Sequence, residues 1–394
     1  MTRQVWKIER FTTNVTNDVM SFTYSTGRQT QFDSWAPGSL ILTIRNESGQ
    51  ANGYDLNDKI ILTADDSSFY QWLYVQEVLF NDMPGTGASS TATIICTDLL
   101  GRLGRIQVFE EPLAVDDTIE QIRAGFEALL PTGTSFATST GNSQAAADTY
   151  TGTGLNRLNL NMTTEQGWVG VNAEVISLIG RDAVTTLLPA TITFARSASG
   201  IYQMGYSNIQ RVALGSNYLN TCTVTPPVAA AQNATDTAGV AAYGTYGTEF
   251  STVDNTGSQA LSFAQWQVFS RDDPDELSFQ ISVSDTANNF SQLFNAFIQN
   301  YVVVTVSYRK PGSLTDLTSS QIMQGWSMSV TPSQTDMQIF TSPLTYTNFF
   351  ILDSSTFGVL GGGAVTYNET AVTYNEATYT YNQAGATAGS RLGW

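Results

Sequence analysis

Short segments in which apolar and polar residues alternate dominate the first third of the sequence. Turn-forming sequences such as NESG from Asn46 separate five of them, which span Val19–Tyr24, Leu40–Arg45, Lys59–Ala64, Tyr70–Phe80 and Thr91–Asp98. Alternation with a period of two is the pattern of a strand that buries one face. Several short strands with turns between them predict a first β-barrel or sandwich unit over residues 1–115.

The low charge content agrees with a β-rich fold. Only 13% of the 394 residues are charged, whereas 42% are hydrophobic. Because long solvent-exposed helices need charged faces, we expect a mainly β fold with a few helices (α+β), in roughly two to four domains. The net charge of −17 argues against a basic surface for nucleic acid or an anionic membrane.

A middle region with mixed strands is expected over residues 116–199, and it begins with a helix over residues 117–130. Asp117 can cap this helix, Glu120 occupies the capping-box position, and Pro131 ends it. Residues 132–154 are rich in Gly, Ser, Thr and Ala and predict a long loop.

A second β-barrel-like unit is predicted over residues 200–360. Residues 229–247 predict a loop of small residues, and the candidate strands are Gln265–Phe269, Leu277–Val283, Tyr301–Tyr308, Ile322–Val330 and Met337–Leu344. A helix is expected over residues 289–300, because one stripe carries Phe290, Leu293, Phe294, Phe297 and Ile298.

The last segment, residues 361–394, is rich in Tyr, Thr and Asn. Its repeat over residues 364–384 has a period of seven, with AVTYNET, AVTYNEA and TYTYNQA in succession. An odd period would place successive tyrosines on opposite faces of an unbroken strand, so we expect short extended pieces. We interpret the segment as an arm that docks on a neighbouring protein.

The chain contains no histidine, which excludes Ser-His-Asp and Cys-His catalysis and HExxH zinc sites. Enzymes based on an N-terminal Thr, a Ser-Lys pair, paired carboxylates or a carboxylate-bound metal remain open. Cys96 and Cys222 are too few for a disulfide framework and are expected to be small buried residues. The N-terminus has no apolar signal-peptide core, and apolar runs such as Tyr301–Val306 are too short to form a membrane anchor.

No residue is predicted to be catalytic, to bind a cofactor or to hold a metal. The acidic cluster of Asp272, Asp273, Asp275 and Glu276 lacks the spacing of a calcium loop and is interpreted as a solvated turn. The acid pairs at residues 65–66 and 116–117 are interpreted as turn and cap residues, and the Gly-Thr-Gly pieces at 85–87 and 152–154 are too short to hold phosphate. Trp72 and Tyr74 could stack on sugars, although in alternating strands they are more often core residues.

Several short motifs resemble, in colinear order, the minor tail proteins of long-tailed, non-contractile bacteriophages. The stretch Tyr24–Gln50 is similar to their opening segment, and DLLGRL from Asp98 resembles the motif that closes their first β-unit. Further matches lie at Glu165, Gly167 and Trp168, in the Tyr243–Gly244 turn, and in FILD from Phe350.

This resemblance implies a structural hub protein of the tail tip, similar to the baseplate hubs of contractile tails. Two tube-like β-barrel units would lie side by side in one chain, and three chains would form a ring of six units. The implied location is the virion tail tip after synthesis in the host cytoplasm, and the implied partners are tube, distal tail and tip proteins. DNA would pass through the ring without binding.

Two alternatives remain open. The chain could be a host-surface carbohydrate-binding or carbohydrate-active protein, or it could form a sixfold distal tail ring.

For the hub, three chains would carry 3 × −17, or about −50 charges, so we expect a channel with more acidic than basic residues.

Overall fold

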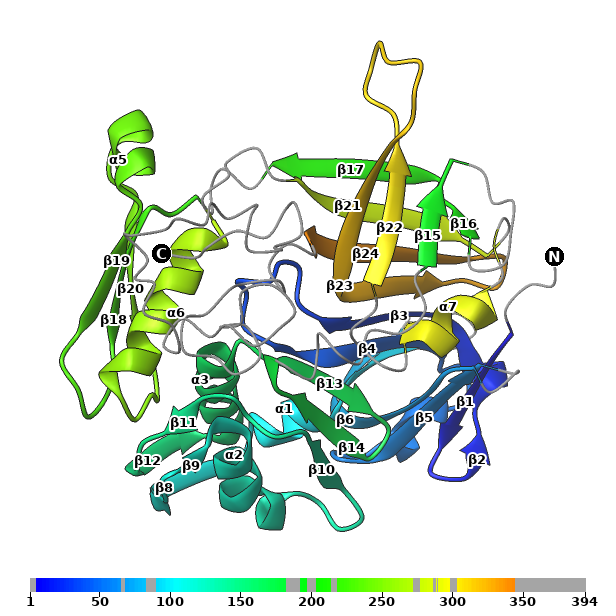
Figure 1. Ribbon diagram of the computed structural model, residues 1–394. Helices are drawn as coiled ribbons and strands as arrows, with labels where there is room; N and C mark the ends of the chain where they lie inside the picture. The colour runs from blue at the N-terminus through cyan, green and yellow to red at the C-terminus, as the bar shows by residue number, and fades with distance from the viewer. Residues whose placement is uncertain are drawn as a thin grey trace. The chain divides into compact units, whose positions relative to one another are not determined.

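The computed structural model of the chain describes residues 5–64, 68–82, 90–181, 192–196, 203–213, 218–271, 277–285, 288, 290–297 and 303–343. The chain divides into a large unit, residues 1–213 and 276–343, and a small unit, residues 214–275 and 344–394. The fold is mainly β with a few helices, as predicted (Figure 1). The four-part division at residues 115, 199 and 360 stays a prediction.

The main sheet of the large unit contains fourteen strands. They are β1 (Trp6–Arg10), β2 (Thr13–Asn14), β3 (Val19–Gly27), β4 (Ala36–Arg45), β5 (Lys59–Ala64), β6 (Tyr70–Asn81), β7 (Thr91–Thr97), β15 (Ile192–Ala195), β16 (Gln203–Gly205), β17 (Asn208–Ala213), β21 (Leu277–Ser284), β22 (Val303–Tyr308), β23 (Leu317–Val330) and β24 (Thr335–Pro343). The longest path is β16-β15-β22-β23-β3-β4-β7-β6-β5-β1-β2, and β24, β21 and β17 continue from β23. Among the described strands, no pairing joins β16 to β2, and the closed barrels stay a prediction.

Strand β23 joins the N-terminal and C-terminal β-rich stretches into this one sheet. One of its edges pairs with β22 over residues 317–322 and with β3 over residues 325–330, while the other edge pairs with β24. Where β3 and β23 meet, Gly27 lies opposite Gly325. Gly27 has φ +82°, and a Cβ there would lie 2.5 Å from the carbonyl oxygen of Gln324, so the crossing requires glycine.

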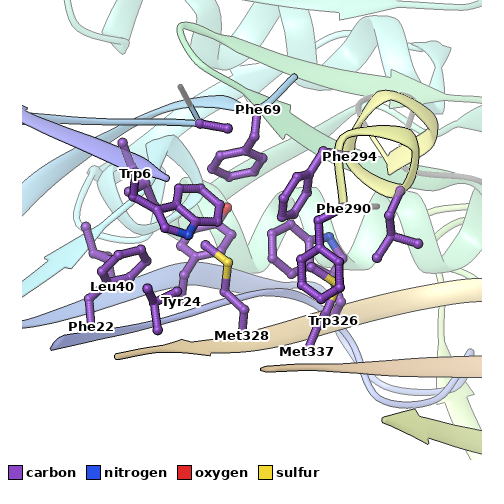
Figure 2. Close-up of a cluster of buried hydrophobic side chains, with 14 of the residues drawn as sticks. Trp6, Phe22, Tyr24, Leu40, Phe69, Phe290, Phe294, Trp326, Met328 and Met337 are labelled. Atoms are coloured by element: carbon purple, nitrogen blue, oxygen red, sulfur yellow. The ribbon is translucent and has the colours of Figure 1, made fainter. Parts of the chain in front are cut away.

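One hydrophobic core is shared by both stretches (Figure 2). Helix α7 (Phe290–Phe297) buries Phe290, Leu293 and Phe294, which confirms this part of the predicted stripe. The ring of Phe294 lies 5.5 Å from that of Trp6 on β1 and 6.0 Å from that of Trp326 on β23. Of the helix expected over residues 289–300, residues 289 and 298–300 lie outside the described residues.

The middle of the large unit is more regular than the sequence predicted. Its elements are α1 (Leu99–Leu103), β8 (Gln107–Leu113), β9 (Asp116–Asp117), α2 (Thr118–Phe126), the 3₁₀ turn Glu127–Leu129, β10 (Ser135–Thr138), β11 (Gln144–Ala145), β12 (Asp148–Thr153), α3 (Gly154–Glu165), β13 (Trp168–Asn172) and β14 (Val175–Ile179). The loop expected over residues 132–154 was therefore wrong, because three strands in it pair with β14, β9 and β8. The helix expected over residues 117–130 is α-helical only to Phe126.

The small unit has its own core, described from Tyr218 to Arg271. It consists of β18 (Thr221–Thr225), β19 (Gln232–Thr235), α5 (Thr237–Tyr243), β20 (Gly247–Ser251) and α6 (Gly257–Phe269), and α6 packs on β18 and β19 (Figure 1). The loop expected over residues 229–247 was wrong, since β19 and α5 lie within it. The strand expected at Gln265–Phe269 was also wrong: α6 buries Ala260, Phe263 and Ala264 at helical spacing.

Candidate assembly surface

The face of the main sheet that lies away from the core carries two rows of mostly polar side chains, in which Tyr74, Thr97 and Ser284 are buried. One register row crosses eight neighbouring strands, from β17 to β6: Asn208, Ser282, Gln338, Ser327, Ser25, Ser39, Thr97 and Tyr74. The adjacent row runs from β21 to β6 and contains Ser284, Asp336, Ser329, Thr23, Ile41, Ile95 and Glu77. We call these two rows the polar face.

The alternate positions of the same strands point into the core. Tyr24, Met328 and Met337 are each at most 3% exposed. The polar face thus follows directly from the alternation of these strands, since successive side chains point to opposite sides of a sheet. A hollow of about 620 Å³ lies over it, lined by Ser25, Ser39, Ser282 and Ser327 among others.

The polar face carries little charge. Its two rows contain the acidic residues Asp336 and Glu77 and no Lys or Arg. The Asp336 carboxylate accepts a hydrogen bond of 2.6 Å from the side-chain amide of Gln334. Apart from Ile41, Ile95 and Tyr74, the two rows consist of hydroxyl and amide groups with two carboxylates, and they offer a polyanion no cation to bind.

Both ends of this eight-stranded stretch have an open edge. Strand β6 pairs with β5 only over residues 70–74, so residues 76–81 have β7 as their one partner strand among the described residues. At the other end, β17 has β21 as its one partner strand among the described residues. Leu79 and Phe80 at the β6 edge are 43% and 48% exposed. Unpaired edges of this kind are ready to accept a further strand.

Residues that carried the family resemblance converge beside the β3–β23 crossing. The Arg28 guanidinium lies over the rings of Trp35 and Trp168, with its central carbon 4.1 and 5.1 Å from their centroids. Its Nε also donates a hydrogen bond of 2.9 Å to Oε1 of Gln324 on β23. These contacts fasten the middle of the large unit to the point where the two β-rich stretches join.

Asp98 and Glu165, two further residues of the resemblance, are buried carboxylates with structural contacts. Asp98 caps α1 and accepts the N–H groups of Gly38 (2.8 Å) and Gly101 (3.2 Å). Burial raises the pKa of Asp98 to about 7, although its backbone hydrogen bonds act in the opposite direction.

Glu165 accepts hydrogen bonds from the Thr118 hydroxyl (2.7 Å) and the Ser143 N–H (2.8 Å), and burial raises its pKa. Asp98 and Glu165 are both 0% exposed, so neither carboxylate faces a space where a substrate could lie.

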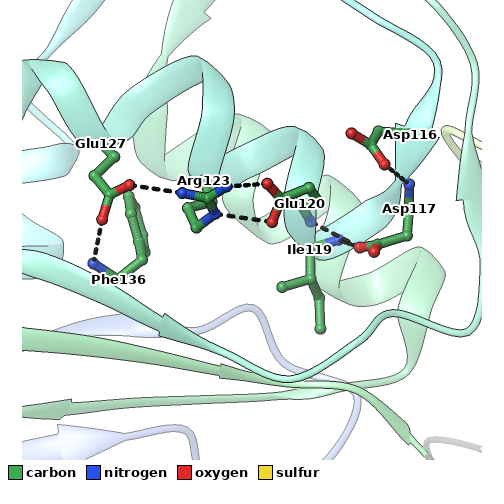
Figure 3. Close-up of polar contacts among 7 residues, drawn as sticks. All are labelled: Asp116, Asp117, Ile119, Glu120, Arg123, Glu127 and Phe136. Carbon is green, nitrogen blue, oxygen red and sulfur yellow. Dashed lines mark hydrogen bonds and ion pairs between the residues drawn. The ribbon is translucent and has the colours of Figure 1, made fainter.

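Of the acid pair Asp116 and Asp117, Asp117 caps α2 as predicted (Figure 3), whereas Asp116 lies in strand β9 opposite Ala145 and not in a turn. Oδ1 of Asp117 accepts the N–H groups of Ile119 (3.0 Å) and Glu120 (2.7 Å). The reciprocal half of the capping box is absent, because the Asp117 N–H donates to Asp116 and the Glu120 carboxylate pairs with Arg123. The cap prediction is confirmed and the full capping box is not.

The other candidates from the sequence are structural or lie outside the described residues. Cys96 and Cys222 are buried free thiols, as expected, and burial raises the pKa of Cys222 to about 11. Lys59 Nζ lies 3.7 Å from the Trp72 ring centroid, and the Arg102 guanidinium lies 5.0 Å from that of Tyr74, so each ring is engaged within the chain.

Gly152 lies in β12 and Gly154 begins α3. The acids at 272–276 and 65–66 and the glycines at 85–87 lie outside the described residues. Across the part of the chain that the structure describes, no three acidic or thiol side chains cluster in a way that could hold a metal ion. No helix in that part is long and apolar enough to cross a membrane.

No protein-family model and no curated protein matches the sequence, but solved structures match the fold. A tail protein from Neisseria meningitidis is similar with a TM-score of 0.58 and 10% identity, over 88% of this chain and 98% of that one. The 43 kDa tail protein of prophage MuSo2 from Shewanella oneidensis gives a TM-score of 0.56 and 10% identity, over 87% and 98% of the two chains.

A third similar structure is the Escherichia coli c3393 protein, a type VI secretion component with structural similarity to the T4 tail proteins gp27 and gp5. It matches with a TM-score of 0.50 and 7% identity, over 83% of this chain and 73% of that one. The resemblance to tail proteins that the sequence motifs indicated is thereby confirmed at the level of fold: this chain has the fold of phage tail proteins.

Proposed function

We propose that the chain is a hub protein of a bacteriophage tail tip, which joins the tail tube to the distal tip and surrounds the DNA exit channel. The observation that carries the proposal is the pairing of β3 with β23, which places the N-terminal and C-terminal β-rich stretches side by side in one sheet. The fold shared with tail proteins supports it. The site of action would be the virion, after synthesis in the host cytoplasm.

Three copies would close into a ring of six β-rich stretches, in which N-terminal and C-terminal stretches alternate. A ring needs a head-to-tail contact in which one surface of a copy fits a different surface of the next. The open edges of β6 and β17 are two such surfaces at opposite ends of the eight-stranded stretch. Pairing of β17 in one copy with β6 in the next would continue the polar face around the ring and satisfy both edges.

The polar face would line the channel. Hydroxyl and amide groups there would interact weakly with passing DNA, while Asp336 and Glu77 repel its phosphates. Tube, distal tail and tip proteins would bind the ring above and below. In this role no residue is required to be catalytic and no cofactor takes part.

A disulfide test addresses the ring directly. Leu79→Cys on β6 is combined in turn with Asn208→Cys, Gln210→Cys and Val212→Cys on β17, all on the same side of the sheet. We expect one pair to give covalent trimers on mild oxidation of assembled tails. The native thiols should not interfere because both are buried.

The matched control pairs Gln210→Cys with Phe109→Cys, since Phe109 is 75% exposed on β8, a strand that pairs with β12 and belongs to neither edge. Monomers from every β6–β17 pair would contradict the strand contact. Covalent hexamers, or a sixfold ring in an image reconstruction of the particle, would instead support the distal tail ring.

A further inference from the structure

Three tyrosines form an aromatic cluster on the small unit. Tyr218 is 8% exposed, whereas Tyr243 and Tyr246 are 57% and 50% exposed. The Tyr218 ring centroid lies 5.3 Å from that of Tyr243 and 5.4 Å from that of Tyr246, with interplanar angles of 75° and 74°. One buried ring therefore supports two exposed rings in edge-to-face contact.

The backbone that carries the two exposed tyrosines is held by Asn220, which is 0% exposed. Its Oδ1 accepts the Tyr246 N–H at 2.8 Å, and its Nδ2 donates to the Gly244 carbonyl at 2.6 Å. Its own N–H donates to the Tyr246 carbonyl, and its carbonyl accepts the N–H of Asp236, the N-cap of α5. Because this frame is fixed before any ligand arrives, binding would cost little ordering of the protein.

The segment that carries the two exposed tyrosines is neutral. Residues 237–248 contain no Asp, Glu, Lys or Arg. The acids that flank this segment are Asp236, whose carboxylate accepts the N–H groups of Ala238 and Gly239, and the exposed Glu249, three residues after Tyr246. This segment offers a phosphate group or an anionic lipid no cation, and the guanidinium of Arg271, whose carbonyl accepts the Leu219 N–H, lies over the Phe250 ring. An apolar peptide would find only small side chains beside the rings, such as the exposed Ala241 and Ala242.

We propose that the tyrosine cluster of Tyr218, Tyr243 and Tyr246 is a binding site for a neutral glycan. A pyranose ring has an apolar C–H face and a rim of hydroxyl groups, and an exposed tyrosine offers an apolar ring face with a hydroxyl at its edge. Thr237 and Thr245 add exposed residues with hydroxyl groups nearby. This activity is separate from the hub function, since no residue of the polar face belongs to the small unit.

The test uses the full chain on arrays of neutral hexose and N-acetylhexosamine oligosaccharides, followed by calorimetry on any oligosaccharide that is retained. We expect the wild type to bind at least one of these oligosaccharides. Its affinity should fall about tenfold or more in Tyr243→Ala and in Tyr246→Ala, whereas Tyr243→Phe should keep the wild-type affinity. The matched control is Tyr70→Ala, because Tyr70 is 41% exposed on the large unit beside Trp72 and should not matter. Circular dichroism and the Tm establish that each variant is folded.

Several results would overturn the inference. They are retention of no neutral oligosaccharide, retention of acidic glycans only, or binding that persists in the Tyr243→Ala/Tyr246→Ala double variant. If the wild type binds no glycan and the double variant no longer binds another tail protein that the wild type binds, the cluster is a protein contact.

Discussion

Asp98→Asn tests whether a buried carboxylate makes the stability of this fold depend on pH. Asp98 caps α1 at the end of β7, is fully buried, and contacts the N–H groups of Gly38 and Gly101. Burial raises its pKa from 3.8 to about 7. Asn resembles the protonated acid in shape and polarity but does not titrate in this range.

The direction in which stability changes with pH follows from the higher pKa of Asp98 in the folded state. Folding favours the protonated form, so the stabilisation is complete below about pH 4 and is lost as the pH rises towards 7. At about 1.4 kcal/mol for each pH unit between the two pKa values, the wild-type free energy of unfolding falls by about 4 kcal/mol relative to the variant.

Urea unfolding of both proteins at intervals from pH 4.5 to pH 8 covers most of this interval and should record a change of about 3 kcal/mol. Other carboxylates titrate in both proteins, so their contributions cancel in the comparison. We expect the variant to gain stability relative to the wild type as the pH rises. A difference that stays constant across the series, or one that changes in the opposite direction, would refute the reasoning.

Three further predictions concern the core, the α2 cap and the polar face. Phe294→Ala should lower the free energy of unfolding by about 3–5 kcal/mol, because this fully buried ring contacts residues of both β-rich stretches. Unfolding followed by tryptophan fluorescence should still show both stretches unfolding in one transition. Asp117→Ala should lower the free energy of unfolding by about 1 kcal/mol in chemical denaturation, since two N–H groups lose their acceptor. The wild type should bind no duplex DNA at physiological salt, whereas Ser25→Lys/Ser327→Lys should bind it with an affinity that falls with salt in fluorescence anisotropy.

Three of the five strands predicted in the first third match to within one residue, whereas β3 and β4 are three and four residues longer than predicted and β1, β2 and β8 were not predicted. Predicted Lys59–Ala64 coincides with β5, and predicted Thr91–Asp98 differs from β7 only at its last residue. Strands with one buried face show their period in the local sequence, which explains this success.

Segments with few large apolar residues were predicted poorly. The strands in residues 132–154 and the helix α5 bury little of their own surface, so no hydrophobic period marks them. Helix α6 had detectable signals: Thr256 as N-cap, Gln259 at the capping-box position, and buried residues at helical spacing.

Which strands are neighbours could not be predicted at all. The pairing of β3 with β23 brings together residues about 300 positions apart, and no local pattern encodes it. The polar face therefore became visible only in the structure. The tyrosine cluster was missed for the same reason, since Tyr218 and Tyr243 meet only because β18 and α5 fold together.

The crossing of β3 and β23 makes a last prediction with a matched control. Gly27 and Gly312 have nearly the same positive φ, +82° and +80°, so alanine is disfavoured by the backbone at both positions. A Cβ at Gly312 would meet nothing within 4 Å, whereas one at Gly27 would lie 2.6 Å from the Cα of Gly325. We expect Gly312→Ala to lower the free energy of unfolding by about 1 kcal/mol, and Gly27→Ala to lower it by clearly more, because β3 must move away from β23. Gly27→Ala should also make amide hydrogens of β3 and β23 exchange faster than in Gly312→Ala. Equal unfolding energies and equal exchange in the two variants would show that this crossing does not hold the two β-rich stretches together, and the hub proposal would lose the contact on which it rests.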